Sequence, residues 1–133
     1  MDEHRVPEGY LKWVIPDCWM PPKGSAEVRG HEAVCITNTG LDLCKVRFTV
    51  FYETATEESG SIIECAARSS LHILLDDETS NGGLKIPRET PYSLEVMSSK
   101  PVVVQYTRVD TRLGGLALMT SLGWPCVDEV DLN

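Results

Sequence analysis

A run of apolar residues that turns into a row of charges limits the folds open to this chain. Side chains alternate between the two faces of a β-strand, so residues of one parity share a face. The run therefore predicts a strand that begins buried and ends with an acid held between two arginines. Such an arrangement either grips a polar ligand or joins two subunits. From residue 102 onward the shared face carries Val102, Val104, Tyr106, Arg108, Asp110 and Arg112.

Short β-patterned segments separated by turn signals recur along the chain. The clearest is 44–52, where apolar residues of even number (Val46, Phe48 and Val50) alternate with polar ones. Residues 54–60 and 76–84 are predicted loops, and Asp76 is expected to be solvated. Residues 116–122 fit either a strand or a helix. Further strands are predicted over 10–15, 33–37, 61–66, 69–75, 92–97 and 102–110, the last two forming a hairpin through 98–101.

The spacing of these segments predicts the fold class. No segment keeps a helical period over the ten or more residues that a helix needs. Short strands at regular spacing predict an all-β fold, a single-domain antiparallel β-sandwich of the jelly-roll kind or a barrel. Neither a repeat nor a linker divides residues 1–133, so we expect one domain with its core at about 10–125. The late apolar residues Leu118, Met119, Trp124 and Pro125 favour a homo-oligomer.

Charge and cysteine content narrow the function. The chain has 20 acidic and 12 basic residues, a net charge of −8, and this field disfavours nucleic acid as a partner. Its apolar runs are too short to cross a membrane, and its first residues lack a signal sequence. We therefore expect a cytoplasmic protein without direct membrane insertion. The five cysteines are odd in number and never form a Cys-x-x-Cys pair, which predicts free thiols.

The segment that begins at His31 and Glu32 superficially matches the zinc motif His-Glu-x-x-His. That motif works on a helix, where positions i and i+4 lie one turn apart. On a strand the same positions lie about 13 Å apart and cannot share one ion. We therefore expect no metal site, and His31 and Glu32 belong either to a ligand site or to an ordinary strand start. Trp19, in a proline-flanked segment, is expected to be exposed, whereas most other aromatic residues are expected in the core.

A series of fragments also occurs in the order of a known family. They are Trp13-Val-Ile-Pro16, Pro21-Pro-Lys-Gly-Ser25, His31-Glu-Ala-Val-Cys-Ile-Thr-Asn-Thr-Gly40, Ala67-Arg-Ser-Ser-Leu-His72, Ile86-Pro-Arg-Glu-Thr90 and Ser99-Lys-Pro-Val-Val-Val-Gln-Tyr-Thr-Arg-Val-Asp-Thr-Arg112. Together, over about residues 10–125, they resemble the sensory rhodopsin transducer family. The resemblance implies a small soluble β-sandwich that forms a homotetramer. It also implies a polar pocket for sugars or similar small molecules, and a founding member that is the cytoplasmic partner of a membrane photoreceptor.

The same resemblance implies a set of ligand-binding residues. This chain departs from the family at Ile73-Leu74, where a basic residue is frequent, and at Tyr106, where a histidine is frequent. Arg68 shares the strand parity of His72 if that strand is regular. The row from Arg108 to Arg112 is read equally as part of a ligand site and as an ion-pair network between subunits. The residues carried over are His31, Glu32, Arg68, His72, Gln105, Arg108, Asp110 and Arg112.

These observations favour a non-enzymatic signalling or adaptor module that binds a small polar, sugar-like ligand. Arginines would donate to the ligand, Glu32 and Asp110 would accept, and histidines with Gln105 would orient it. One alternative is a protein–protein transducer that docks a membrane receptor or a regulator without a small ligand. Another is an enzyme of sugar metabolism with His31 or His72 as base. Since no nucleophile motif, metal set or cofactor loop accompanies these residues, we expect no catalytic residues and no cofactor.

Overall fold

A computed structural model describes residues 6–126, and β-strands form all of its regular structure. No helix long and apolar enough to cross a membrane occurs in this part of the chain. The predicted all-β antiparallel fold is confirmed. The strands are β1 (Tyr10–Trp19), β2 (His31–Asn38), β3 (Cys44–Tyr52), β4 (Glu57–Ser59), β5 (Ile63–Cys65), β6 (Ser69–Leu74), β7 (Pro91–Asp110), β8 (Ala117–Leu122) and β9 (Trp124–Pro125).

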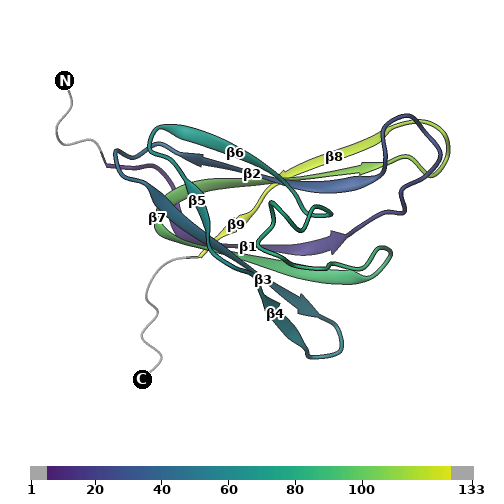
Figure 1. Ribbon diagram of the computed structural model, residues 1–133, viewed down its shortest axis with the longest axis horizontal. Helices are drawn as coiled ribbons and strands as arrows, with labels where there is room; N and C mark the ends of the chain where they lie inside the picture. Colours follow the sequence, from purple (N-terminus) through teal and green to yellow (C-terminus); the bar gives the residue numbers. More distant parts are fainter. Residues whose placement is uncertain (1–5, 127–133) are drawn as a thin grey trace.

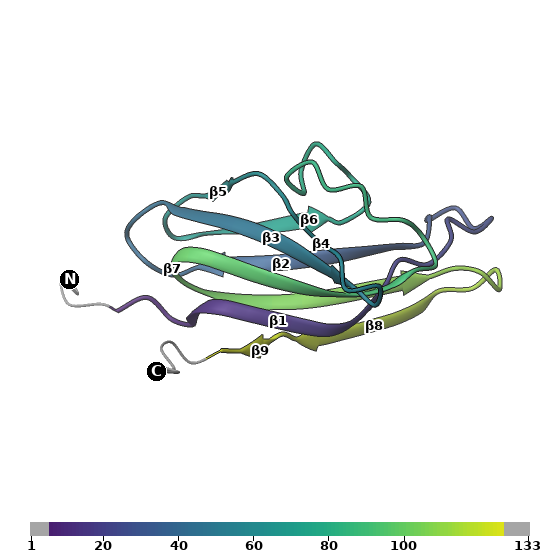
Figure 2. The same ribbon diagram turned by 90° about the horizontal axis from the view of Figure 1, so that it is seen from below.

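The strands form two antiparallel layers that share one long strand. In the first, β4 and β5 pair with β3, which is followed in order by β7, β1 and β9. In the second, β6 pairs with β2, and β2 and β8 flank the other half of β7. Figure 1 shows β2, β6 and β8 in the upper layer and β1, β3 and β4 in the lower one, and Figure 2 shows the same layers after a quarter turn. We call the layer that contains β1 sheet A and the layer that contains β2 sheet B.

The predicted hairpin between 92–97 and 102–110 is wrong. These residues form the single strand β7, whose first half pairs with β1 and β3 and whose second half pairs with β2 and β8. The presumed turn at 98–101 is the point where the strand passes from one sheet to the other. Pro101 is tolerated there because the ladder with β3 stops at Ser98 and the ladder with β2 starts at Val103.

Other boundaries were predicted with mixed success. The strand at 44–52 is confirmed with the same bounds, and 117–122 is a strand rather than a helix. The first strand is longer than expected, because Pro16 and Asp17 form an irregularity between paired residues Ile15 and Cys18 and do not end it. The predicted polar loop at 54–60 contains the short strand β4, which pairs with β3.

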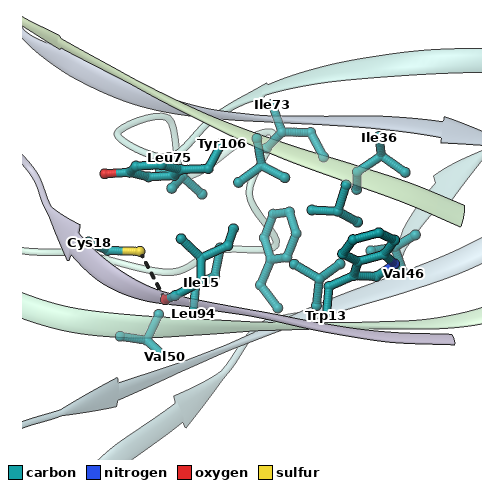
Figure 3. Packing of buried hydrophobic residues seen from close by; sticks show 14 of the residues in the cluster. Trp13, Ile15, Cys18, Ile36, Val46, Val50, Ile73, Leu75, Leu94 and Tyr106 are labelled. Carbon is teal, nitrogen blue, oxygen red and sulfur yellow. Dashed lines mark hydrogen bonds between the residues drawn. The ribbon is translucent and has the colours of Figure 1, made fainter. Parts of the chain in front are cut away.

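The core lies between the two sheets and follows the predicted alternation. Val46, Phe48 and Val50 of β3 are fully buried. Figure 3 shows the two sides of the core, with Tyr106 and Ile36 from sheet B facing Ile15, Leu94 and Val50 from sheet A. Trp13 is buried as expected, and its Nε1 donates to the Val102 carbonyl oxygen at 2.9 Å, where β7 changes sheets.

The aromatic residues outside the core differ from the prediction. Trp19 lies on β1 and is half-buried, so its expected place in an exposed loop is wrong. Trp124 is 71% exposed on the surface of sheet A, although an aromatic residue was expected in the core. The apolar pattern of the sequence did not distinguish the positions of these two tryptophans from that of the buried Trp13.

Candidate functional site

Glu32 lies at the centre of a buried polar cluster that joins the two sheets. It is the second residue of β2 and shares its inward face with Val34 and Ile36, and no part of it is exposed. The hydroxyl groups of Tyr92 and Tyr106 donate to its two carboxylate oxygens. The backbone nitrogen of Trp19 donates to Oε2 at 2.9 Å. The carboxylate therefore holds β1, β2 and both halves of β7 together.

Arg108 closes the cluster on the side of β1. It lies opposite Glu32 in the pairing of β2 with β7, and its Nε is 4.0 Å from Glu32 Oε2. The same Nε donates to the Tyr106 hydroxyl at 3.2 Å. Its Nη2 donates to the Asp17 carbonyl oxygen at 3.0 Å, at the irregularity in β1. Arg108 therefore links the buried carboxylate to the surface.

Burial sets the protonation of the cluster. Desolvation raises the pKa of Glu32 above its usual range, and hydrogen bonds from Tyr106, Tyr92 and the Trp19 backbone, with the charge of Arg108, oppose that rise. Desolvation also raises the pKa of Tyr92 and Tyr106, and the neighbouring carboxylate raises both further. Both tyrosines therefore remain protonated donors at neutral pH.

Arg112 and Asp110 continue the row toward the turn between β7 and β8. Asp110 accepts from Arg112, with Nη2 2.6 Å from Oδ2, and this pairing lowers the pKa of Asp110. The Arg112 guanidinium lies 4.7 Å from the centre of the Trp19 ring, and that of Arg108 lies 6.0 Å from it. A hollow of about 660 Å³ beside them is lined by Asp110, Arg112, Leu113, Gly115, Leu116 and Ala117.

Three of the predicted site residues lie on the opposite face of sheet B. His72 and Gln105 flank Cys35 on β2, as its partners on β6 and β7. The Cys35 sulfur is 3.4 Å from His72 Nδ1. His31 shares the parity of Cys35, and its Nδ1 lies 2.8 Å from the Arg29 carbonyl oxygen. Because neighbouring residues of β2 point to opposite faces, these side chains cannot share a pocket with Glu32 and Arg108.

Arg68 lies at the other end of β2 from Glu32. It precedes β6 and has a positive φ of 53°, so the regular strand that would give it the parity of His72 does not reach it. Its Nη1 donates to the Thr39 carbonyl oxygen. The structure therefore divides the eight predicted residues into three groups. The first is Glu32 and Arg108 with the continuing residues Asp110 and Arg112, the second is His31, His72 and Gln105 on the opposite face of sheet B, and the third is Arg68 alone.

Sequence reasoning missed several members of polar clusters. Tyr92 has the parity of Leu94 and Val96, which indicated its burial but not its partner. Asp76 was expected in a solvated turn, yet its side chain is only 8% exposed and accepts from Arg29 and Arg88 at 2.7 and 2.6 Å. Within residues 6–126, no group of three or more His, Cys, Asp or Glu side chains is placed to hold a metal ion.

Apolar side chains are exposed along the chain from the turn after β7 to the end of β9. Every residue of β8 is exposed, and no charged residue occurs from 113 to 126. Among the described residues β8 pairs with β7 alone, so its outer edge has no partner there. We call this the β8 surface, and it comprises Leu113 (99% exposed), Leu116 (59%), Leu118 (69%), Met119 (39%), Leu122 (65%) and Trp124 (71%).

The comparisons with known proteins agree with this architecture. The family model described as the Anabaena sensory rhodopsin transducer matches residues 8–125. The chain belongs to the Anabaena sensory rhodopsin transducer family. The earlier resemblance is therefore confirmed at the level of the family.

Two solved structures extend the match to the fold of this transducer family. One, titled as the crystal structure of Thermotoga maritima 1070, is 34% identical, with a TM-score of 0.78 over 88% of this chain and 95% of that one. The other, the Anabaena sensory rhodopsin transducer, is 26% identical, with a TM-score of 0.65 over 77% of this chain and 99% of its own. No curated protein matches the chain.

Proposed function

We propose that this chain is a non-enzymatic cytoplasmic signalling adaptor that works as a homo-oligomer, with the β8 surface joining its copies. The observation that carries the proposal is the uncharged strand β8 at the edge of sheet B, every residue of which is exposed. Exposed edge strands in monomeric proteins carry charges, prolines or bulges that prevent pairing with other chains. Since β8 has none of these, its exposure suits an edge that is covered in the working protein.

A second copy of the chain is the occupant that best fits this edge. Two β8 strands related by a two-fold axis would pair antiparallel, and each would present the same residues to the other. Leu118 and Leu122 share one face of the strand and would meet their counterparts across the axis. One such contact joins two chains, so the tetramer that the resemblance implies would also use a second, different interface.

The signalling role extends the family membership to this chain. One solved relative is named as a sensory rhodopsin transducer, which makes a membrane receptor the partner class of that protein. We infer that this chain likewise docks a receptor or a regulator through its assembled surface. The match to this relative supports a receptor or regulator as the class of partner.

Introducing a charge into the β8 surface tests the self-association. We expect the wild-type protein to run as an oligomer in size-exclusion chromatography with light scattering, and Leu118→Asp to run as a monomer, because a buried unpaired carboxylate is costly. The matched control is Leu41→Asp, since Leu41 is 62% exposed in the connection between β2 and β3. It should leave the oligomer unchanged. A monomeric wild type, or equal effects of both variants, would contradict the proposal.

A second candidate function is the binding of a small polar ligand beside Trp19. The observation that favours it is the placement of two guanidinium groups against one indole ring, next to the hollow at Asp110 and Arg112. Aromatic rings and guanidinium groups are suited to sugars and sugar acids. Glu32 would act here only by holding Arg108, since none of its surface is exposed.

A thermal-shift screen tests this second candidate. We expect a saturable rise in Tm with one class of sugar or sugar acid, because a ligand that binds the folded state stabilises it. Arg112→Ala should abolish the shift, and Arg47→Ala on the outer face of β3 should leave it intact. Arg112 is preferred to Arg108 for this variant because its side chain is 51% exposed and not part of the buried cluster. If no sugar or sugar acid raised the Tm while the oligomer stayed intact, the ligand-binding candidate would be contradicted and the adaptor proposal would stand.

A further inference from the structure

Two of the five cysteines lie directly opposite each other on neighbouring strands. In the pairing of β3 with β5, Cys44 is the partner of Cys65, and both residues are fully buried. Directly opposed residues of antiparallel strands point to the same face, with Cα atoms about 4.5–5.5 Å apart. Disulfides join cysteines whose Cα atoms are about 4.4–6.8 Å apart. The backbone therefore already brings the Cα atoms of these two residues within the range of a disulfide.

The present contacts of the two sulfur atoms are weak. Cys44 Sγ donates to the Lys100 carbonyl oxygen at 3.5 Å, and Cys65 Sγ lies 3.9 Å from the Ser69 carbonyl oxygen. Both thiols are free, and neither makes a strong hydrogen bond that would oppose rotation toward the other. None of the remaining three cysteines is the strand partner of another cysteine.

We propose that Cys44 and Cys65 form a redox modification site, in which a hydroperoxide converts the two thiols into a disulfide that fixes β5 to β3. In the first step, one thiolate attacks the peroxide oxygen, the O–O bond breaks, and a sulfenic acid and an alcohol or water result. In the second step, the other thiol attacks this sulfur, the S–O bond breaks and water leaves. Two thiols are oxidised, and one hydroperoxide is reduced.

The position of β5 explains how buried thiols meet the oxidant. This strand has three residues and lies at the edge of sheet A, where β3 is its strand partner. Short edge segments open at much lower free energy than the whole protein. Opening exposes Cys65 and removes the burial that raises its pKa, so a thiolate can form there. When β5 closes again, Cys44 is the thiol that faces the oxidised sulfur.

The disulfide would act on the connection between the two sheets. Residues 66–68 lead from β5 in sheet A to β6 in sheet B, and Asn38 Nδ2 donates to the carbonyl oxygens of Cys65 and Ala66 at 3.3 and 3.1 Å. Fixing Cys65 to β3 therefore keeps the start of this connection attached to sheet A. Figure 1 shows β5 beside β3 at the end of the sandwich from which β6 departs.

The test treats the purified wild-type protein with hydrogen peroxide, then alkylates it and analyses it by mass spectrometry. We expect the intact mass before alkylation to fall by two hydrogen atoms, and the alkylated protein to carry three labels in place of five. We also expect a single cross-linked peptide pair that contains Cys44 and Cys65, and a Tm raised by about 5–10 °C. A thiol reductant should reverse both changes. Cys35→Ser should keep them, and Cys65→Ser should lose them. Five unmodified thiols, or cross-links through other cysteines or between chains, would overturn the proposal. Because the wild-type peptide map alone decides this, the result does not depend on the folding of a variant.

Discussion

Glu32→Ala is expected to destabilise the protein by about 3–5 kcal/mol, which corresponds to a fall in Tm of about 10–15 °C. The substitution removes the acceptor for the hydroxyl groups of Tyr92 and Tyr106 and for the Trp19 backbone nitrogen. It also leaves the partly buried Arg108 without its buried carboxylate partner, and the other carboxylate near it, that of Asp17, is 91% exposed. Urea unfolding followed by tryptophan fluorescence measures the loss, since Trp13 is in the core.

Two variants separate the role of the carboxylate from that of its position. Glu32→Gln keeps the shape but replaces one acceptor by a donor, so we expect an intermediate loss of about 1–3 kcal/mol. His31→Ala changes the neighbouring residue on the outer face of the same strand, and its effect should be below about 1 kcal/mol. If Glu32→Ala cost no more than His31→Ala, the buried cluster would not contribute to stability.

The pH dependence of the Glu32 variants follows from the direction of its shift. Burial raises the pKa of Glu32, so the folded protein binds its proton more tightly than the unfolded chain does. The corresponding stability is fully present below the unfolded pKa of about 4.3 and is lost as pH rises through the folded value. The advantage of wild type over Glu32→Gln should therefore shrink from acidic to neutral pH. If the stability of wild type relative to Glu32→Gln instead grew over this range, the hydrogen bonds that lower the pKa of Glu32 would outweigh the burial that raises it.

The sequence predicted the face of the strand on which Arg108 lies but not the residues that it contacts. Strand parity correctly placed Val104, Tyr106 and Arg108 together, because alternation is a property of the local backbone. The burial of Glu32 could not be predicted in the same way, since an acidic side chain at a core position contradicts the hydrophobic pattern. Its partners come from residues 19, 92 and 106, which meet only once the strands are paired.

The error at β7 has a similar origin. Ser98 to Pro101 has the composition of a turn, and local rules assign a hairpin to two β-patterned segments joined by such residues. The chain does bend back there, but its two halves pair with different strands, β3 on one side of the bend and β2 on the other, and not with each other (Figure 1). That choice is made by the long-range packing of the two sheets. It also explains why Tyr92 and Tyr106 reach the same carboxylate.

Arg88→Ala is expected to cost about 2–4 kcal/mol, because this side chain holds three parts of the chain at once. Arg88 Nη1 donates to the carbonyl oxygens of Pro21 and Gly30 at 2.7 and 2.8 Å, and Nη2 lies 2.6 Å from Asp76 Oδ2. Removing it leaves a nearly buried carboxylate with a single arginine, Arg29. Thermal unfolding at neutral pH measures the loss. The matched control is Arg29→Ala, which should cost less than about 1 kcal/mol, since Arg29 is 46% exposed.

The dependence of stability on acidic pH distinguishes the loss of the Arg88–Asp76 ion pair from a simple loss of packing. Although burial raises the pKa of Asp76, the hydrogen bonds and charges of Arg29 and Arg88 outweigh it and hold that pKa below its usual range. The stability that results is present above the unfolded pKa of about 3.9 and is lost as pH falls through the folded value. The difference between wild type and Arg88→Ala should therefore narrow in acid. A constant difference across that range would mean that Arg88 acts through its contacts with Pro21 and Gly30 and not through Asp76.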